Sequence, residues 1–383
     1  MTVLTEMQTA IRDAVRTFAQ EKIRPHSAQF EAAGGFPAEL FLEMAALGLW
    51  GMTAPEAYGG TEADAVSYAL ALIELAAADG ALSTIVSIQN SLLVAGLLRD
   101  GTQAQKTRFL PDLIGGRTIG SFALTEADAG SDAAAIRTRA VKVMGGWSIN
   151  GTKQFITSGK IGGLTLVIAV TDPEAKKKGL SAFLVPTDRP GYGVDKIEHK
   201  MGQRASDTCA LRFVDLFVED ELMLGRMGEG YRIALSNLET GRIGIAAQCV
   251  GMARAALEIA VTYALERRSM GKLIVEHQAV GLRLADLATR LEAARQLVLS
   301  AAALRDAGQP ALIAASMAKL FASETAEAVV SGAMQTLGGY GYLEEFGVAK
   351  IYRDVRVCQI YEGTSDIQRM VIARSLRAIC SAA

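Results

Sequence analysis

Five consecutive residues near the carboxyl terminus, Tyr361-Glu362-Gly363-Thr364-Ser365, combine one carboxylate with an adjacent glycine. Apolar residues recur on both sides of this segment, between Ile351 and Ile360 and between Ile367 and Ile372. A glutamate held among such neighbours is poorly solvated, which disfavours its charged form and raises its pKa towards neutrality. A carboxylate tuned in this way can take a proton from carbon at physiological pH. The glycine leaves room for a substrate or cofactor to approach the backbone beside that base.

The same five residues are also typical of a helix N-terminus. In that interpretation Thr364 or Ser365 caps the last helix and Glu362 is solvated. The local sequence alone favours this second interpretation, so the choice depends on the rest of the chain.

Other segments contain residue types that suit a flat heterocycle or a nucleotide. Phe122 to Asp132 runs from a strand into small polar residues, whose N–H groups and hydroxyls can bind a ring edge or a phosphate. Asn150 to Thr157 places an aromatic and a hydroxyl side chain two residues apart on one strand face. Gln335 to Gly341 ends a helix with glycines, and Arg267-Arg268 ends another with cations. Each also has an ordinary explanation: a turn, a core aromatic residue, a Schellman-type cap and a favourable helix-dipole contact.

Three parts with different hydrophobic periods must position these segments. Residues 1–118 and 226–383 show helical spacing, and the long helices of the second part are typical of an antiparallel bundle. Residues 119–225 contain short β-type runs, with a hairpin turn at Gly145-Gly146 and a second turn at Asn150-Gly151. The sequence therefore predicts an α+β multidomain protein that is mainly α. Its parts are an N-terminal helical domain, a middle antiparallel β-domain (a barrel or sandwich) and a C-terminal four-helix bundle.

Composition and charge exclude several classes of function. The chain has 383 residues, 39 basic against 41 acidic, and a net charge of -2, which gives no electrostatic footprint for nucleic acid or an anionic membrane. Its three histidines form no HExxH motif and no metal-ligand spacing, so we expect no metal site. The four cysteines, Cys209, Cys249, Cys358 and Cys380, are far apart, which indicates reduced, buried thiols.

We recognise no targeting or membrane-spanning segment in the sequence. The N-terminal residues lack the basic and apolar regions of a signal peptide, so we expect a cytoplasmic protein. The uncharged stretch from Gly80 to Leu98 is about 19 residues long, close to membrane-spanning length. It contains Ser, Gln and Asn in its middle, and we interpret it as a helix buried in protein rather than a membrane span. Neither a GxGxxG motif nor a P-loop is present, so a bound dinucleotide would be held differently.

Taken in order along the whole chain, these motifs resemble the acyl-CoA dehydrogenase family. The carrying segments are the Phe122–Asp132 loop, the Asn150–Thr157 strand, Met201-Gly202-Gln203-Arg204, Gly241 to Gln248, the Leu265–Gly271 turn, Glu276-His277-Gln278, Gln335–Gly339 and Tyr361–Ser365.

The resemblance implies an FAD-dependent enzyme that removes two hydrogens from the α and β carbons of an acyl-CoA thioester. By the resemblance, Glu362 takes the α-proton while the β-hydrogen leaves as hydride to flavin N5. The thioester carbonyl is polarised by a ribityl hydroxyl of the flavin and by the backbone N–H of the same glutamate. This fits a desolvated carboxylate beside donors aimed at a developing enolate.

The family's other site residues are expected at matching positions of this chain. Those expected to bind FAD are Phe122, Leu124, Thr125, Ser131, Phe155, Ile156, Thr157, Arg267, Gln278, Gln335, Leu337, Gly338, Gly339, Thr364 and Asp366. Arg267, Gln278 and Gln335 to Gly339 would bind the pyrophosphate and adenosine part across a subunit boundary. Those expected to contact the substrate are Ser131, Glu239, Arg242 and Gly363.

At Phe155, Ala127-Asp128 and Gly241 a comparison with the residues of the family bears on the flavin site or on the identity of the base. Many relatives have tryptophan at Phe155 and Pro-Gly at Ala127-Asp128, and phenylalanine keeps a stacking face for the flavin. Relatives that act on isovaleryl and long-chain substrates carry their glutamate near Gly241 instead. Since that position is glycine here and Glu362 is present, Glu362 is the expected base.

Several segments look most like short-chain and short-branched-chain members, which predicts a C4-to-C6-type acyl-CoA preference. The resemblance also implies electron transfer to an electron-transferring flavoprotein and a homotetramer, or dimer of dimers, built on the bundle. Two alternatives remain among enzymes: an acyl-CoA oxidase, disfavoured because the long C-terminal extension of the large oxidases is missing, and a dehydrogenase of a carrier-protein thioester. An alternative of another class is a flavin-bound assembly protein without turnover, which an intact Glu362 disfavours.

Overall fold

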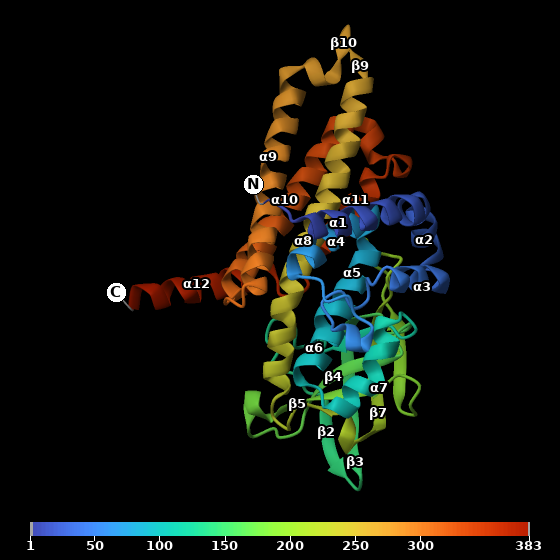
Figure 1. The fold of residues 1–383 in the computed structure, drawn as a ribbon, viewed down its shortest axis with the longest axis vertical. Coiled ribbons are helices and arrows are strands. Elements are labelled where there is room, and N and C mark those ends of the chain that lie inside the picture. The colour runs from blue at the N-terminus through green and yellow to red at the C-terminus, as the bar shows by residue number, and fades with distance from the viewer. Residues whose placement is uncertain (1–2, 382–383) are drawn as a thin grey trace.

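The computed structural model describes residues 3–381, with side chains described as far as residue 376. Helices form the two ends of the chain and a β-sheet forms the middle (Figure 1). This confirms the predicted order of a helical, a β and a second helical part. Cys209, Cys249 and Cys358 are buried free thiols, as predicted, whereas Cys380 lies outside the described side chains.

The N-terminal part is a group of short helices around one very apolar pair. They are α1 (Glu6–Phe18), α2 (Ser27–Ala33), α3 (Ala38–Ala46), α4 (Ala65–Ala78), α5 (Gly80–Ile88), α6 (Ala95–Asp100) and α7 (Gln103–Ile114). Capping boxes at Thr5 and Thr102 begin α1 and α7, and Asp64 and Asp79 cap α4 and α5. Almost every residue of α4 and α5 is buried, so these two helices form the centre of the part.

The middle part is one mixed sheet. Its strands are β1 (Gly120–Ala123), β2 (Arg139–Val143), β3 (Gly146–Thr157), β4 (Leu164–Val170), β5 (Leu180–Pro186), β6 (Tyr192–Ile197), β7 (Thr208–Glu219) and β8 (Met223–Leu224). They follow the order β6-β7-β3-β2-β4-β5-β8, and β1 pairs with β4. Most pairs are antiparallel as predicted, but β4 pairs in parallel with both β1 and β2.

One predicted turn is confirmed and the other is wrong. Gly145 has φ +78° and joins β2 to β3 in a hairpin. Asn150-Gly151 lies inside β3, where the pairing with β7 shifts its register and Gly151 adopts φ +147°. Any side chain at Gly151 would meet Thr138, with Cβ only 2.6 Å from Oγ1. The glycine therefore accommodates a β-bulge rather than a turn.

The C-terminal part contains α8 (Gly230–Glu266), α9 (Gln278–Asp306), α10 (Leu312–Leu337), α11 (Val348–Val355) and α12 (Ser365–Ser381). The helices α8, α9 and α10 pack side by side, and α4 packs against α8 and α9. A Cβ at Gly251 would lie 2.2 Å from the Ile73 carbonyl oxygen, so this glycine lets α8 approach α4 closely. The last helix, α12, contacts α10 and projects away from the body (Figure 1). A two-stranded ribbon of β9 (Arg268–Ser269) and β10 (Lys272–Leu273) lies at the far end of α8.

Two helical segments of the described chain have the length and composition to cross a membrane. They are Gly80–Asp100 and Gly230–Glu266, and 89% and 78% of their most apolar windows are buried inside the protein. Burial of this extent is typical of core helices, which agrees with the interpretation of the first segment as a helix buried in protein.

Candidate active site

Glu362 lies in a tight loop between a short 3-10 helix (Arg356–Gln359) and α12. Its φ is +55° and that of Gly363 is +88°, so two successive residues have left-handed backbone. The Glu362 Oε2 atom is buried and has no hydrogen-bond partner among the described residues. Burial raises the pKa of Glu362 to about 7, although the positive charges of Lys319 and Arg242 act to lower it. The predicted rise in the pKa of this carboxylate is therefore confirmed.

The helix cap proposed as the competing interpretation is also present. The Thr364 hydroxyl accepts a hydrogen bond of 3.3 Å from the Ile367 N–H at the start of α12. The cap on Thr364 is therefore confirmed, but the solvated Glu362 of that interpretation is wrong, because Glu362 Oε2 is buried.

A glycine of α8 makes room for the carboxylate. A Cβ at Gly241 would lie 2.6 Å from Glu362 Oε2 and 2.9 Å from its Cδ, too close for any side chain. The next residue, Arg242, is buried and donates a 3.1 Å hydrogen bond from Nη1 to Ser316 Oγ, while its Nε has no partner among the described residues. Burial lowers the pKa of Arg242, and the charges of Glu362 and the half-buried Glu239 oppose this effect. The structure thus brings Glu362, Gly363, Arg242 and Glu239 together.

Tyr361, the residue before Glu362, is held by buried hydrogen bonds. The Tyr361 hydroxyl donates to Gln248 Oε1 of α8 at 2.5 Å and accepts from Gln203 Nε2 at 3.3 Å. The Thr84 hydroxyl of α5 donates to Gln203 Oε1 at 2.7 Å and accepts from Gln248 Nε2 at 2.6 Å. Side chains from the N-terminal, middle and C-terminal parts therefore meet at Tyr361.

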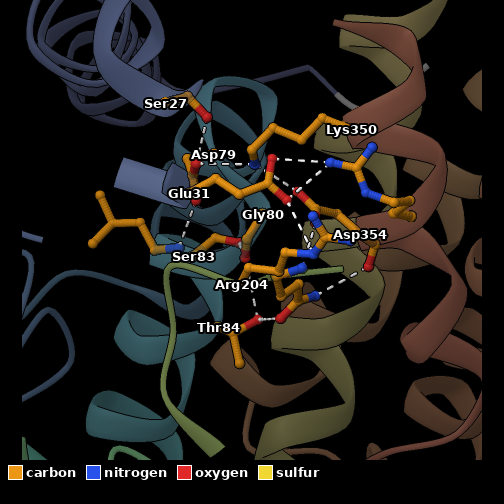
Figure 2. Close-up of polar contacts among 12 residues, drawn as sticks. Ser27, Glu31, Asp79, Gly80, Ser83, Thr84, Arg204, Lys350 and Asp354 are labelled. Carbon is orange, nitrogen blue, oxygen red and sulfur yellow. Dashed lines mark hydrogen bonds and ion pairs between the residues drawn. The ribbon is translucent and has the colours of Figure 1, made fainter. Parts of the chain in front are cut away.

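A buried ionic cluster extends this network away from the base (Figure 2). The Lys350 ammonium lies 2.7 Å from Asp354 Oδ2 and 3.1 Å from Asp79 Oδ2. Asp354 also accepts a hydrogen bond from the Gln203 N–H, and Asp79 accepts one from the Ser27 hydroxyl. Because Lys350 is paired with two carboxylates, its positive charge is stabilised despite burial. The cluster fixes the three parts of the chain relative to the Glu362 loop.

The segments predicted to border a flavin ring also lie together. The Gln154 N–H donates to the Thr125 carbonyl at 2.8 Å, and the fully buried Lys153 ammonium donates to the Leu124 carbonyl at 3.0 Å. Phe155, the next residue of β3, is 63% exposed and has φ +60°. The β3–β7 pairing is irregular here, so Phe155 and Thr157 do not share a face through regular strand alternation as expected.

The remaining residues of this group differ in exposure. Ile156 is buried in the core of the sheet, Phe122 and Thr157 are half-buried, and Ser131 is exposed on its loop. Asp366 is exposed at the start of α12, where it lies 3.5 Å from the Arg369 guanidinium.

A second group of predicted residues surrounds a cavity of about 520 Å³ at the far end of α8. Its lining includes Arg267, Leu337, Gly338 and Gly339, and also the hydroxyl residues Ser269 and Thr336. A Cβ at Gly338 or Gly339 would meet nothing within 4 Å, so the backbone at these glycines is open to a ligand. Gln278 and Gln335 are exposed and do not line the cavity within one chain.

The cavity and Glu362 are far apart in one chain. Gly241 lies against Glu362, whereas Glu266, the residue before Arg267, ends the same helix, α8. At 1.5 Å per residue Gly241 and Glu266 are about 38 Å apart along the helix axis. The two groups of predicted residues therefore do not form one continuous site within a single chain.

Lys319, which contacts the loop around Glu362 and Gly363, belongs to none of the motifs recognised in the sequence. Lys319 of α10 is fully buried and donates to the Gly363 carbonyl at 2.7 Å. The signal that could have revealed it is a single charged residue in the otherwise small and apolar run from Ala314 to Ala322.

Comparison with known proteins gives matches over almost the full chain. Family models for acyl-CoA dehydrogenase match residues 5–117 (N-terminal domain), 121–216 (middle domain) and 228–377 (C-terminal domain). The chain is 43% identical over 373 residues to an acyl-CoA dehydrogenase of Bacillus subtilis, covering 97% of this chain and 98% of the relative. It is 42% identical to the mitochondrial short-chain specific acyl-CoA dehydrogenase of Bos taurus, covering 97% and 90%.

Solved structures agree with these matches. Butyryl-CoA dehydrogenase from Megasphaera elsdenii is 39% identical with a TM-score of 0.96, covering 98% of this chain and 99% of that one. A chain from the structure of the electron transferring flavoprotein of Acidaminococcus fermentans is 40% identical with a TM-score of 0.96, covering 98% and 99%. The glutaryl-CoA dehydrogenase of Mycobacterium smegmatis in complex with FADH2 is 33% identical (TM-score 0.93, covering 97% and 95%). The prolyl acyl carrier protein oxidase AnaB is 32% identical (TM-score 0.93, covering 98% and 100%).

Proposed function

This chain belongs to the acyl-CoA dehydrogenase family of oxidoreductases, and we propose that it converts a short-chain acyl-CoA to the trans-2-enoyl-CoA with Glu362 as the base. The observation that carries the proposal is the state of this one carboxylate. The half-buried Glu362 lies beside a glycine, its buried Oε2 has no hydrogen-bond partner among the described residues, and its pKa is about 7. Such a group is ionised often enough at neutral pH to accept a proton, and basic enough to take it from carbon.

The surrounding residues keep the base aimed and its charge balanced. Tyr361 is held by Gln248 and Gln203, so the loop cannot swing away when the substrate enters. Arg242 and Lys319 place two positive charges near the carboxylate. When Glu362 takes the α-proton and becomes neutral, these cations remain and favour the negative charge that develops on the thioester.

The residues present fit FAD as the cofactor. The cavity beside Arg267 combines a cation, two hydroxyl residues and open glycine backbone, which is a donor set suited to a pyrophosphate. The exposed Phe155 ring beside Thr125 offers a stacking face and a polar edge to a flat heterocycle. When bound, FAD would accept the hydride that leaves the β carbon.

Two copies of the chain are needed to hold one FAD in this way. The separation of about 38 Å between the base and the Arg267 cavity exceeds the reach of one FAD molecule. We therefore propose that Arg267, Gln278 and Gln335 to Gly339 bind the FAD of a neighbouring subunit. The exposure of Gln278 and Gln335 supports this arrangement, as does the family's expected homotetramer.

A short acyl group is supported by the side chains behind the base. The Tyr68 hydroxyl, whose pKa is raised by burial and also by the charge of Glu362, packs with Ser87 and Leu72 against Gly244, one turn beyond Gly241 on α8. The name of the Bos taurus relative also supports a short chain.

Electron transfer to an electron-transferring flavoprotein completes the proposal, supported by the similar chain from the Acidaminococcus fermentans structure. A carrier-protein thioester is the second candidate substrate, because a carrier protein oxidase, AnaB, resembles this chain over its full length.

The test is a product assay on purified protein supplied with FAD. Butanoyl-, hexanoyl-, 2-methylbutanoyl-, isobutanoyl- and octanoyl-CoA would be offered together with the same acyl groups on a carrier protein. The enoyl product is identified by mass, with an electron-transferring flavoprotein or oxygen as acceptor. We expect turnover of a C4 to C6 acyl-CoA with the flavoprotein. Turnover of carrier thioesters alone would select the second candidate, and turnover that rises steadily to octanoyl-CoA would contradict the chain length.

A further inference from the structure

Lys319 is a buried cation without a carboxylate partner. Its side chain is 0% exposed, and among the described residues it forms no ion pair. Its one hydrogen bond runs from Nζ to the Gly363 carbonyl oxygen at 2.7 Å. Burial lowers the pKa of Lys319, while the neighbouring thiols of Cys249 and Cys358 and the carboxylate of Glu362 act to raise it. A lysine in this setting is costly to bury, because the desolvation of its charge is offset by a single neutral acceptor.

The acceptor of this hydrogen bond belongs to the strained part of the base loop. Glu362 and Gly363 both have positive φ, and Glu362 is a non-glycine residue in the left-handed region. The Gly363 carbonyl accepts a second hydrogen bond from Gln368 Nε2 at 3.0 Å, and the same amide donates to the Glu362 carbonyl at 3.2 Å. Lys319 and Gln368 thus hold the backbone of the loop through its carbonyl groups.

Few charged or titratable groups face Glu362 from the elements packed around it. The cations that act on its carboxylate are Lys319 from α10 and Arg242 from α8. Arg242 also senses Glu239, on its own helix, and the Tyr68 hydroxyl of α4 senses both Glu362 and Arg305 of α9. Arg242 donates its hydrogen bond to Ser316, whereas Lys319 is the cation that, among the described residues, donates a hydrogen bond to the loop itself.

We propose that Lys319 is a positioning residue of the dehydrogenation: its ammonium holds the Gly363 carbonyl so that the Glu362 carboxylate is aimed at the substrate, and its positive charge favours the ionised form of that carboxylate. The role in turnover rests on the proposed function, whereas the effect on Glu362 rests on the hydrogen bond from Lys319 to the Gly363 carbonyl, supported by the charge of Lys319 near the carboxylate, and can be measured without turnover. The two effects also differ in what they require of the side chain, since the first needs a donor at one place and the second needs a positive charge.

The experiment compares Lys319→Met, Lys319→Gln and Lys319→Arg with Arg254→Met as a matched control. Arg254 is a cation of the same bundle that pairs with Glu74, and Glu74 keeps Arg16 when Arg254 is lost. Protonation of Glu362 is followed by infrared spectroscopy on FAD-loaded protein as the carboxyl C=O band that Glu362→Gln removes. We expect Lys319→Met and Lys319→Gln to shift the midpoint of this band upward by about one pH unit, as expected for loss of a nearby opposite charge. We expect Lys319→Arg to keep the midpoint and Arg254→Met to leave it unchanged.

Turnover provides the second readout. At pH 7 we expect kcat with the preferred short-chain acyl-CoA to fall about tenfold in Lys319→Met, with little change in KM, since the carboxylate is both less ionised and less well aimed. Lys319→Arg is expected to lose part of kcat through displaced geometry while keeping the wild-type pH dependence. Arg254→Met is expected to lower the melting temperature only.

The outcomes separate the inference from the proposed function. A folded Lys319→Met or Lys319→Gln protein with the wild-type infrared midpoint and the wild-type kcat would overturn the inference. If the wild-type protein turns over no acyl-CoA, the proposed function fails, while the infrared midpoint still decides whether Lys319 acts on Glu362. If neither neutral variant folds, Lys319→Arg decides the matter, because its bulkier head displaces the 2.7 Å contact with the Gly363 carbonyl. An unchanged infrared midpoint together with an unchanged kcat in this variant would overturn the positioning role.

Discussion

Replacing Glu362 by glutamine should make the protein more stable at alkaline pH. The pKa of Glu362 is about 7 in the folded protein and 4.5 for an ordinary glutamate. A group whose folded pKa is raised stabilises the folded state fully below its unfolded pKa, and this stability is lost as the pH rises through the folded pKa. The loss in wild type therefore develops between about pH 4.5 and 7 and stays constant above that range.

The size of the effect follows from the shift. At 1.36 kcal/mol per pKa unit, the raised pKa costs about 3 kcal/mol of stability at pH 8.5, where Glu362 is ionised in its site. It costs about 1.5 kcal/mol at pH 5.5, where Glu362 must take up a proton on folding. Glutamine has nearly the same shape and carries no charge, so Glu362→Gln removes this cost. We expect the variant to gain about 3 kcal/mol in the free energy of unfolding at pH 8.5 and about half of that at pH 5.5.

Urea unfolding at both pH values, at equal protein concentration and with FAD in equal excess, measures these differences. Glu74→Gln is the matched control, because Glu74 is a buried glutamate whose pKa is lowered by Arg254 and Arg16. Its neutralisation removes the buried carboxylate that both cations share, leaving Arg254 only its pair with Glu258, and should destabilise the protein by about 3 kcal/mol. Equal or lower stability of Glu362→Gln at pH 8.5 would refute the reasoning that burial raises the pKa of this carboxylate.

Three further predictions concern the base and the cofactor. Since the proposed base acts in its ionised form, kcat/KM should fall about tenfold per pH unit below pH 7 and level off above it. Initial-rate measurements in which kcat/KM begins to fall only below pH 5 would contradict this. Gly241→Ala places a Cβ 2.6 Å from Glu362 Oε2, and displacement of the carboxylate should lower kcat by about 10²-fold in the same assay with little loss of FAD. An unchanged kcat would contradict this, because it would show that the loop adjusts without losing the position of the carboxylate. Arg267→Ala should weaken FAD binding at least about tenfold, as measured by fluorescence titration. The control Arg212→Ala, on the exposed face of β7 where Arg212 pairs with Asp195, should not weaken it. Equal FAD affinity in both variants would contradict a role of Arg267 in the cofactor site.

The local sequence around Glu362 left two interpretations open, a buried carboxylate and a solvated helix cap, and favoured the second. The order of motifs along the whole chain favoured the first, and for a buried carboxylate the direction of the pKa shift follows from burial. The order of helical and β parts follows from local periodicity.

Features that depend on distant contacts could not be predicted in this way. Lys319 is 44 residues from Gly363, and Gln248 is 113 residues from Tyr361, so no local pattern relates the members of either pair. The parallel pairing of β4 with β1 and β2 likewise depends on how the chain crosses over. Asn150-Gly151 was mistaken for a turn because a glycine with positive φ serves a β-bulge as well as a hairpin.

The central claim is that Glu362 starts the reaction by removing a proton from a short acyl-CoA. Anaerobic mixing of the FAD-loaded protein with butanoyl- or hexanoyl-CoA, followed by the visible flavin absorbance, tests it directly in a single turnover. We predict that the wild-type flavin band bleaches within the mixing experiment and that the Glu362→Gln band persists, although the variant still binds the ligand. Bleaching of the variant at the wild-type rate would contradict the assignment of the base, and a wild-type band that no acyl-CoA bleaches would contradict the proposed reaction.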